Sequence, residues 1–207
     1  MSEKANFSNI HKFYDLINTI LTLGFDKSWR EKAVDNLIGT SVLDLGSGTG
    51  AAFDQLLNYE TTAIDPDKKM LELNTFENKV LGSAENLPFE DNSFDNVFCS
   101  FVWRNVSDTN KALEEVYRVL RPGGKFILLD MTRPKNSFLK MLHKIGTFKV
   151  LHLIGLLTFN LKEYRFLYKS LDFYPQPEDH LKKDTFVDLK IERMGLFNFV
   201  YLAVFTK

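Results

Sequence analysis

The chain has 207 residues, of which 44% are hydrophobic and 26% are charged, and its formal net charge is −1. This composition is typical of a globular protein and excludes intrinsic disorder. A nearly neutral molecule lacks a strong positive field, so no nucleic acid is expected as a partner. The single cysteine excludes an intramolecular disulfide and a cysteine-rich zinc site, and no metal is expected. The first ten residues show no signal-peptide pattern, which predicts a cytoplasmic location.

The N-terminal part of the chain is predicted to be helical. Apolar side chains recur at helical spacing over residues 10–23, and a second short helix is predicted over 28–37. We treat these helices, residues 1–38, as the first part of a single domain that covers residues 1–207.

Strands and helices then alternate over residues 40–131. This alternation indicates βαβ units and a parallel sheet, and the apolar strands indicate a sheet covered on both faces. Strands are predicted over residues 41–45, 61–65, 80–81, 95–101 and 125–130, and helices over 51–57, 67–73 and 110–120.

The C-terminal part differs from this core. Residues 136–183 are predicted to be helical and to form a lid inserted before the last two strands, which span 185–191 and 197–206 around Gly195. Two adjacent strands with a short connection indicate a hairpin. The complete pattern predicts an α/β fold: a Rossmann-like, doubly wound, mostly parallel seven-stranded sheet with a C-terminal antiparallel hairpin and a helical lid.

A glycine-rich turn follows the first predicted strand, with the sequence Gly46-Ser47-Gly48-Thr49-Gly50. Glycine permits positive φ and lets backbone N–H groups approach a ligand. Asp65 ends the second predicted strand, where a carboxylate can accept both hydroxyls of a ribose. The turn and this carboxylate together predict a site for a ribose-containing cofactor.

Two cofactor classes fit this pattern. Gly46, Gly48 and Ala51 also satisfy the fingerprint of dinucleotide binding, which leaves an NAD-dependent oxidoreductase open. Asp44, inside the apolar first strand, would repel a pyrophosphate and attract an ammonium or sulfonium group. A cationic cofactor is therefore favoured, and a structural turn without a ligand is the remaining alternative.

Four motifs in order, from the glycine turn to the segment 117–124, resemble the class I S-adenosylmethionine-dependent methyltransferases. Further segments are similar to the ubiquinone/menaquinone biosynthesis C-methyltransferases, most specifically Arg104-Asn105-Val106. The motifs that carry the two resemblances lie at residues 42–50, 82–89, 92–97 and 117–124, and at 13–18, 23–30, 100–106 and 164–170. This chain has Val102 and Trp103 where the family commonly has Gly-Leu.

The resemblance implies S-adenosyl-L-methionine as the cofactor. The glycines and Thr49 would hold its methionine portion, Asp65 its ribose, and Ser83 and Ala84 its adenine, with Ser100 at the methionine end. The full set of implied cofactor-binding residues is Asp44, Gly46, Ser47, Gly48, Thr49, Gly50, Asp65, Pro66, Ser83, Ala84, Glu85, Ser100 and Phe101.

The resemblance also implies methylation of a ring carbon of a polyprenylated quinol in menaquinone or ubiquinone biosynthesis. Arg104 is the first candidate for catalysis, since a guanidinium can stabilise a phenolate or orient a water, and its alternative is a structural salt bridge. Tyr14 would line the pocket or pack in the core. A methyltransferase of the same class with another small-molecule or lipid substrate, and a non-catalytic cofactor-binding protein, stay as alternatives.

Positive charge is concentrated in residues 121–169, which hold ten basic and two acidic residues, a net charge of +8. Within this range, lysines such as Lys140 and Lys144 alternate with apolar residues over 136–160. This pattern is typical of a helix that binds an anionic membrane surface, and it predicts a peripheral location. A core-packing helix with solvated lysines is the alternative, and a homodimer is left open.

Overall fold

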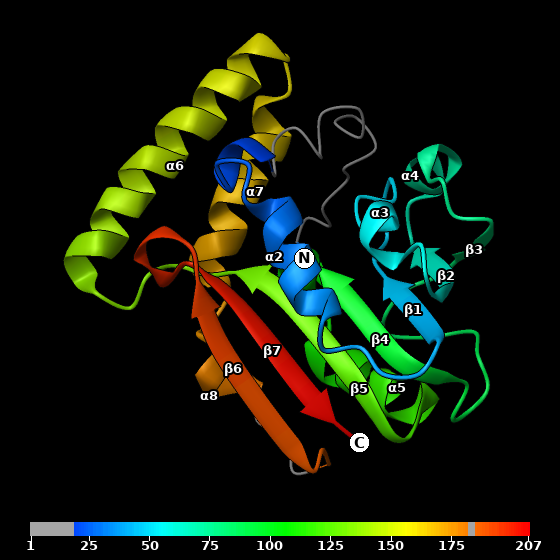
Figure 1. Ribbon diagram of the computed structural model, residues 1–207. Helices are drawn as coiled ribbons and strands as arrows, with labels where there is room; N and C mark the ends of the chain where they lie inside the picture. Colours follow the sequence, from blue (N-terminus) through cyan, green and yellow to red (C-terminus); the bar gives the residue numbers. More distant parts are fainter. Residues whose placement is uncertain (1–18, 182–184) are drawn as a thin grey trace.

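The computed structural model describes residues 19–181 and 185–207, and within them the strands form one seven-stranded sheet (Figure 1). The strand order is β3-β2-β1-β4-β5-β7-β6, and β7 is antiparallel to both of its neighbours while the other pairs are parallel. This order confirms the predicted doubly wound sheet and its C-terminal hairpin. The strands are β1 Ser41–Leu45, β2 Glu60–Asp65, β3 Asn78–Leu81, β4 Phe94–Ser100, β5 Leu120–Met131, β6 Asp188–Met194 and β7 Val200–Thr206.

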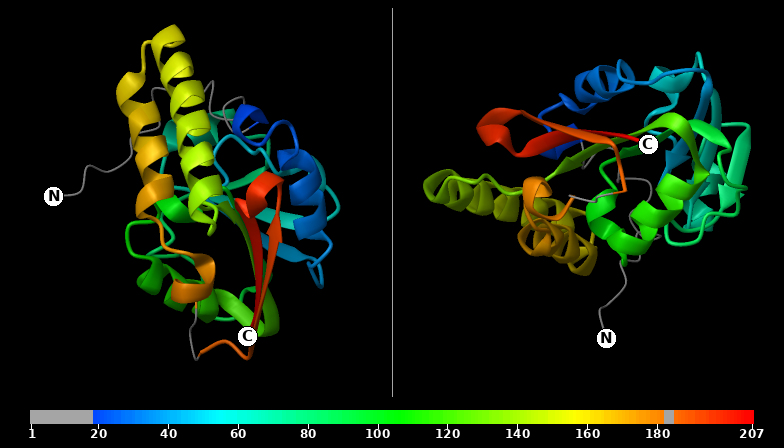
Figure 2. Two further views of the ribbon diagram at one scale, coloured as in Figure 1. Left: turned by 90° about the vertical axis from the view of Figure 1, so that its left-hand side faces the viewer. Right: turned by 90° about the horizontal axis from the view of Figure 1, so that it is seen from below.

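Helices cover both faces of the sheet, as the view along its edge shows (Figure 2). One buried cluster joins α2 and α3 to one face, and a second cluster joins α5 to the other. The helices are α2 Asp26–Val34, α3 Phe53–Leu56, α4 Lys68–Leu73, α5 Thr109–Val119, α6 Ser137–Leu157, α7 Leu161–Phe173 and α8 Pro177–His180, with 3₁₀ turns η2 Trp103–Asn105 and η3 Leu196–Asn198.

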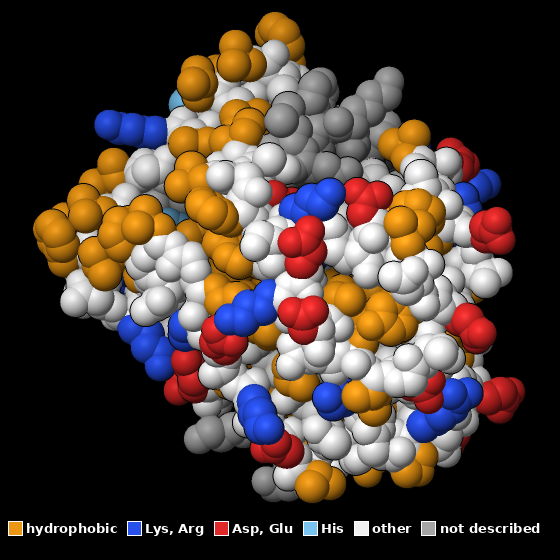
Figure 3. All heavy atoms as spheres, viewed as in Figure 1, with side chains coloured by type: hydrophobic (Ala, Val, Ile, Leu, Met, Phe, Trp, Pro, Cys, Tyr) orange, Lys and Arg blue, Asp and Glu red, His pale blue; other side chains and the backbone are white. Residues whose placement is uncertain are grey.

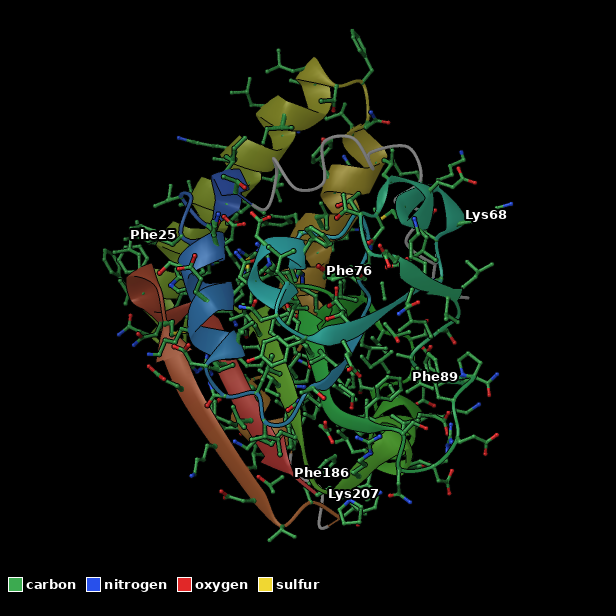
Figure 4. All side chains as sticks on the ribbon, turned by 45° about the vertical axis from the view of Figure 1, so that its right-hand side comes forward. Phe25, Lys68, Phe76, Phe89, Phe186 and Lys207 are labelled. Atoms are coloured by element: carbon green, nitrogen blue, oxygen red, sulfur yellow. The ribbon has the colours of Figure 1, made fainter. Side chains whose placement is uncertain are left out.

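The central strands are apolar because both of their faces are buried. Val42 and Leu43 in β1 point to opposite faces, and both are fully buried. Outside the central strands, apolar side chains also point inwards and charged ones outwards. Figure 4 shows Phe76 pointing into the molecule and Lys68 pointing outwards. The Phe76 ring centroid lies 5.0 Å from that of Phe53.

Side-chain caps explain where three of the helices begin. Asp67, Asp108 and Asn136 each accept hydrogen bonds from two backbone N–H groups in the first turn of α4, α5 and α6, respectively. Such caps satisfy donors that have no partner within the helix, and each stabilises its helix by about 1 kcal/mol.

Several predicted strand limits are wrong, and the largest differences lie at an edge strand, at an irregular pairing and in the C-terminal hairpin. β3 has four residues rather than two, because backbone pairing with β2 holds Asn78 and Lys79 although neither favours a strand. β5 begins at Leu120 and not at Lys125, and its register against β4 shifts at the Pro-Gly-Gly segment, which resembles a loop in sequence. In the hairpin, β6 spans Asp188–Met194 instead of 185–191, and β7 begins at Val200 instead of residue 197 because Leu196–Asn198 form the turn η3.

Helices α6 and α7 pack against each other as a hairpin that projects beyond the sheet on the side of the carboxyl ends of the parallel strands (Figures 1 and 2). Leu171, near the end of α7, belongs to the same buried cluster as Phe101, which follows β4. The base of the hairpin is thus attached to the loop after β4. Among the described helices, none combines the length and the apolar character needed to cross a membrane.

Candidate functional site

The glycine turn is held against the end of β2. The backbone N–H groups of Gly46 and Ser47 donate to the carbonyl oxygen of Ile64 over 2.8 and 3.0 Å. Gly46 and Gly48 have φ angles of +72° and +55°, which favour glycine. These contacts and angles bring the N–H of Gly48 to the Asp65 carboxylate, at 2.9 Å.

Two buried carboxylates lie beside this turn. Asp65 accepts a second hydrogen bond from the N–H of Asp67 at 2.8 Å, and Asp44 accepts one from the Ser47 hydroxyl at 2.6 Å. Burial raises the pKa of Asp44 to about 6, against the opposing effects of Ser47 and Arg30. Burial likewise raises the pKa of Asp65 to about 6, against its two N–H donors. Because both carboxyl groups are desolvated, a cation bound beside them would stabilise their ionised forms.

A buried cation, Arg30 in α2, completes this edge and was missed in the sequence. Its guanidinium pairs with Asp26 at 2.7 Å, donates from Nε to the Ser100 hydroxyl at 3.4 Å, and lies 5.2 Å from the centre of the Phe101 ring. Its positive charge also acts to lower the pKa of Asp44, against the larger effect of burial, so Arg30 interacts electrostatically with the end of β1. Its only sequence signal is its place in the segment 23–30 that resembles the methyltransferases.

Asn74, which follows α4, holds the glycine turn through its side chain, and no motif in the sequence indicated this role. Its side-chain amide donates to the Ser47 hydroxyl at 2.8 Å and to the Gly48 carbonyl at 3.0 Å. The turn is therefore fixed by side chains as well as by backbone, which keeps it preorganised for a ligand.

The loop after β4 is strained and firmly tied. Phe101 has a φ angle of +61°, which is costly for a bulky residue, and its N–H donates to the Leu129 carbonyl at 2.7 Å. Arg104 is buried: its guanidinium pairs with Asp130 and donates to the Phe101 carbonyl at 3.0 Å, while its backbone N–H donates to Asp130 at 2.9 Å. Arg104 thus forms the salt bridge that was the structural alternative for it.

The remaining predicted residues lie at the same edge of the sheet. Pro66 is exposed directly after Asp65, and Ser83 and Ala84 are half-buried after β3. The Glu85 carboxylate accepts the N–H of Ser107 at 3.0 Å, so it joins this loop to the segment before α5. Thr49 and Gly50 complete the glycine turn, and Tyr14 lies outside the described residues.

The geometry fits an adenosyl cofactor with a positive charge. The strand order reverses between β1 and β4, where doubly wound sheets bind ligands. A Cβ added at Gly48 would make only an ordinary contact with the Met70 sulfur, at 3.5 Å, so no side chain crowds the backbone of the turn there. Asp44 would repel a pyrophosphate at this place and suits a cationic group, whereas Asp65 suits the ribose hydroxyls that both cofactor classes carry.

A sequence comparison decides between the alternatives. A model of the ubiE/COQ5 methyltransferase family matches residues 3–199. The chain belongs to this family. This ubiE/COQ5 methyltransferase is 37% identical to a ubiquinone/menaquinone biosynthesis C-methyltransferase of Rickettsia bellii over 84% of its own length and 78% of the relative. It is 36% identical to that of Rickettsia felis, over 91% and 86% of the two chains.

Solved structures agree with the family at the level of the fold. A SAM-dependent methyltransferase of Thermotoga maritima, described as a possible histamine N-methyltransferase, superposes with a TM-score of 0.71 at 23% identity, over 97% of both chains. A putative S-adenosyl-L-methionine-dependent methyltransferase of Methanococcus maripaludis gives 0.62 at 22% identity, over 100% of this chain and 97% of the other. The cofactor of the ubiE/COQ5 methyltransferase is S-adenosyl-L-methionine, and the oxidoreductase alternative is set aside.

Proposed function

We propose that this enzyme methylates a ring carbon of a polyprenylated quinol of the demethylmenaquinol type. The observation that supports this substrate most directly is the 36–37% identity to quinone-biosynthesis C-methyltransferases over most of the chain. The heavy load of 19 Phe residues is consistent with an apolar substrate and a dry pocket. Because the quinol dissolves in a bilayer, the proposal includes peripheral binding to a membrane.

The cofactor site is proposed to work by holding charge and orientation. Asp65 would accept the ribose hydroxyls, Asp44 would favour the positive charge, and Arg30 would pair with the methionine carboxylate. When bound, S-adenosyl-L-methionine supplies the methyl group from a sulfonium. Fixed alignment of two reactants can contribute about 7–11 kcal/mol in the best cases, which is why a turn held by Asn74 matters.

Arg104 is proposed to contribute in two ways. Its ion pair with Asp130 fixes the loop that carries Phe101, so the part of the site formed by this loop keeps its shape. As the donor end of this buried, overall neutral ion pair, the guanidinium would also present N–H dipoles that favour the ionised phenol oxygen of a quinol bound beside the loop. An ionised phenol oxygen makes the neighbouring ring carbon a stronger nucleophile.

The function can be tested by methyl incorporation. Purified enzyme, labelled cofactor and demethylmenaquinol in detergent micelles should give a product with one added methyl group on the quinone ring, located by mass spectrometry and NMR. Histamine and a phospholipid amine serve as competing acceptors. Methylation of another acceptor and not of the quinol would contradict the proposal, as would failure to methylate the quinol when the cofactor binds normally.

Cofactor affinity is expected to rise with pH between about 5 and 7. Asp44 and Asp65 have a pKa of about 6 in the ligand-free protein, and a cationic ligand favours their ionised forms. Below that pKa, binding must release a proton from each group, so affinity should fall about tenfold per pH unit for each carboxyl that ionises. Calorimetry in buffers of different ionisation enthalpy measures both affinity and proton release.

The control for this prediction is Asp65→Asn. It should weaken binding at pH 7 by about 1.5–3 kcal/mol, as expected for a hydrogen bond to a charged group, and should remove part of the pH dependence. Equal affinity at pH 5 and pH 7 in the unmodified enzyme would show that neither carboxyl titrates on binding.

A further inference from the structure

The connection between α6 and α7 exposes an unusual amount of apolar surface. Residues 150–161 contain no charged side chain. Within them, Phe159 is 94% exposed and Leu157 72% exposed. Figure 3 shows hydrophobic side chains gathered at the top of the molecule, where α6 meets α7. We name this surface the apolar tip; its members are Leu153, Leu156, Leu157, Phe159 and Leu161.

The outer side of α6 continues the apolar tip toward the start of the helix. The exposed residues on this side are Phe138, Met141, Leu142 and Ile145. The predicted basic face lies elsewhere: Lys140 and Lys144 share the side of Thr147, which is buried, and the Lys144 ammonium pairs with Asp172 at 3.2 Å. The side of α6 that continues the apolar tip is therefore mainly apolar, while Lys140, which is exposed, and Lys144, whose side chain is 39% exposed, lie on another side of the helix.

The charges near the apolar tip indicate which kind of partner can bind it. Residues 131–171 contain eight basic residues and one acidic residue, Glu163. Lys149 and Lys162, both exposed, stand at the two ends of the uncharged segment. A second copy of the chain would bring the same positive charges against them, whereas an anionic bilayer offers an apolar interior below a negative surface.

We propose that the apolar tip inserts into the acyl boundary of an anionic bilayer, with Lys149 and Lys162 at the level of the lipid phosphates. This inference deepens the proposed function and rests on it in one respect, the supply of a bilayer-dissolved quinol. The thirteen residues of α7 span about 20 Å between the tip and the end of the helix that packs near Phe101. The hairpin would thus hold the loop after β4 within reach of a long polyprenyl tail.

Vesicle flotation tests the surface directly. The full chain should float with vesicles of equimolar phosphatidylglycerol and phosphatidylcholine, and much less with phosphatidylcholine alone. Replacing Lys149 and Lys162 with Gln should lower partitioning by about fivefold for each lysine. The matched control, Lys68→Gln with Lys69→Gln on α4, should leave it unchanged.

The apolar contribution needs its own variant. Leu156→Asp with Phe159→Asp should lower partitioning by at least about tenfold, because two inserted side chains are lost. Leu57→Asp with Leu81→Asp is the matched control, since these leucines are 60% and 58% exposed and lie after α3 and in the edge strand β3, away from α6 (Figure 1). A Trp in place of Phe159 should be quenched by brominated lipids, and a Trp in place of Leu57 should not.

Three outcomes would overturn the inference: equal flotation with neutral and anionic vesicles, an equal loss in the Leu57 and Leu81 control, or a dimer in light scattering that the Phe159 variant dissociates. The activity of the Leu156 and Phe159 variant separates this inference from the proposed function. That variant should methylate a short-tailed, water-soluble quinol at the normal rate and lose activity only on quinol embedded in vesicles. A fourth outcome, the absence of flotation by the unmodified enzyme together with normal activity on micellar quinol, would overturn this inference and leave the proposed function standing.

Discussion

Asp130→Ala is expected to destabilise the folded protein by about 3–5 kcal/mol, the largest stability effect that we predict. The substitution leaves the Arg104 guanidinium charged and buried without its carboxylate. It also removes the acceptor of the Arg104 and Met131 backbone N–H groups. Urea unfolding followed by circular dichroism measures the loss. Asp130→Asn keeps an acceptor but not the charge, so its free energy of unfolding should lie between those of the unmodified protein and Asp130→Ala.

A double variant separates the structural role of Arg104 from a catalytic one. Replacing Arg104 with Met and Asp130 with Leu removes both charges together, which should restore most of the stability. If the guanidinium of Arg104 also favours the phenolate, turnover should still fall on the order of 10²-fold, with unchanged cofactor affinity. Full turnover in the stable double variant would remove Arg104 from the chemistry, and a double variant as unstable as Asp130→Ala would refute the ion-pair argument.

Gly46→Ala should have the second large effect, about 2–4 kcal/mol of stability together with a loss of cofactor binding. A methyl group at this position would require a left-handed backbone and would also meet the Val102 side chain, all three of whose side-chain carbons would lie within 3.1 Å. Relief of the overlap would have to shift the glycine turn or the loop after β4. Thermal unfolding and calorimetry with the cofactor measure the two losses.

A compensating substitution tests whether overlap with Val102 causes the loss in Gly46→Ala. Val102→Ala makes room for the new methyl group, so the pair of substitutions should recover the steric part of the loss and keep only the cost of the left-handed backbone, about 1 kcal/mol. Gly123→Ala is the matched control, because Gly123 has a similar φ angle of +79° but nothing within 4 Å of an added Cβ. If Val102→Ala restores nothing, the overlap is not the cause.

Features of the site that depend on neighbouring residues could be predicted from the sequence. The turn at Gly46 and the carboxylate at Asp65 each end a buried strand, and the carboxyl ends of adjacent parallel strands meet at one edge. Strand limits failed where pairing overrode composition, as at Asn78 in β3 and at the Pro-Gly-Gly segment of β5.

Features that join distant parts of the chain could not be predicted. Arg30 reaches Ser100 seventy positions away, and Arg104 reaches Asp130 across twenty-six. No local pattern marks such partners, because they are selected by how α2 and η2 pack on the finished sheet. The contacts of α6 could not be predicted for the same reason: its sequence shows that Lys140 and Lys144 share a side, but only the structure shows that Lys144 pairs with Asp172.

The position of β7 between β5 and β6 has a consequence for how the polypeptide is made. Both long pairings of the last sheet strand, with Lys125–Met131 on one side and Asp188–Met194 on the other, require residues 200–206. On the ribosome, the β5 edge therefore stays open while some seventy further residues are synthesised. An apolar strand with unpaired backbone groups is a template for aggregation, so the nascent chain should depend on chaperone shielding until its final strand emerges.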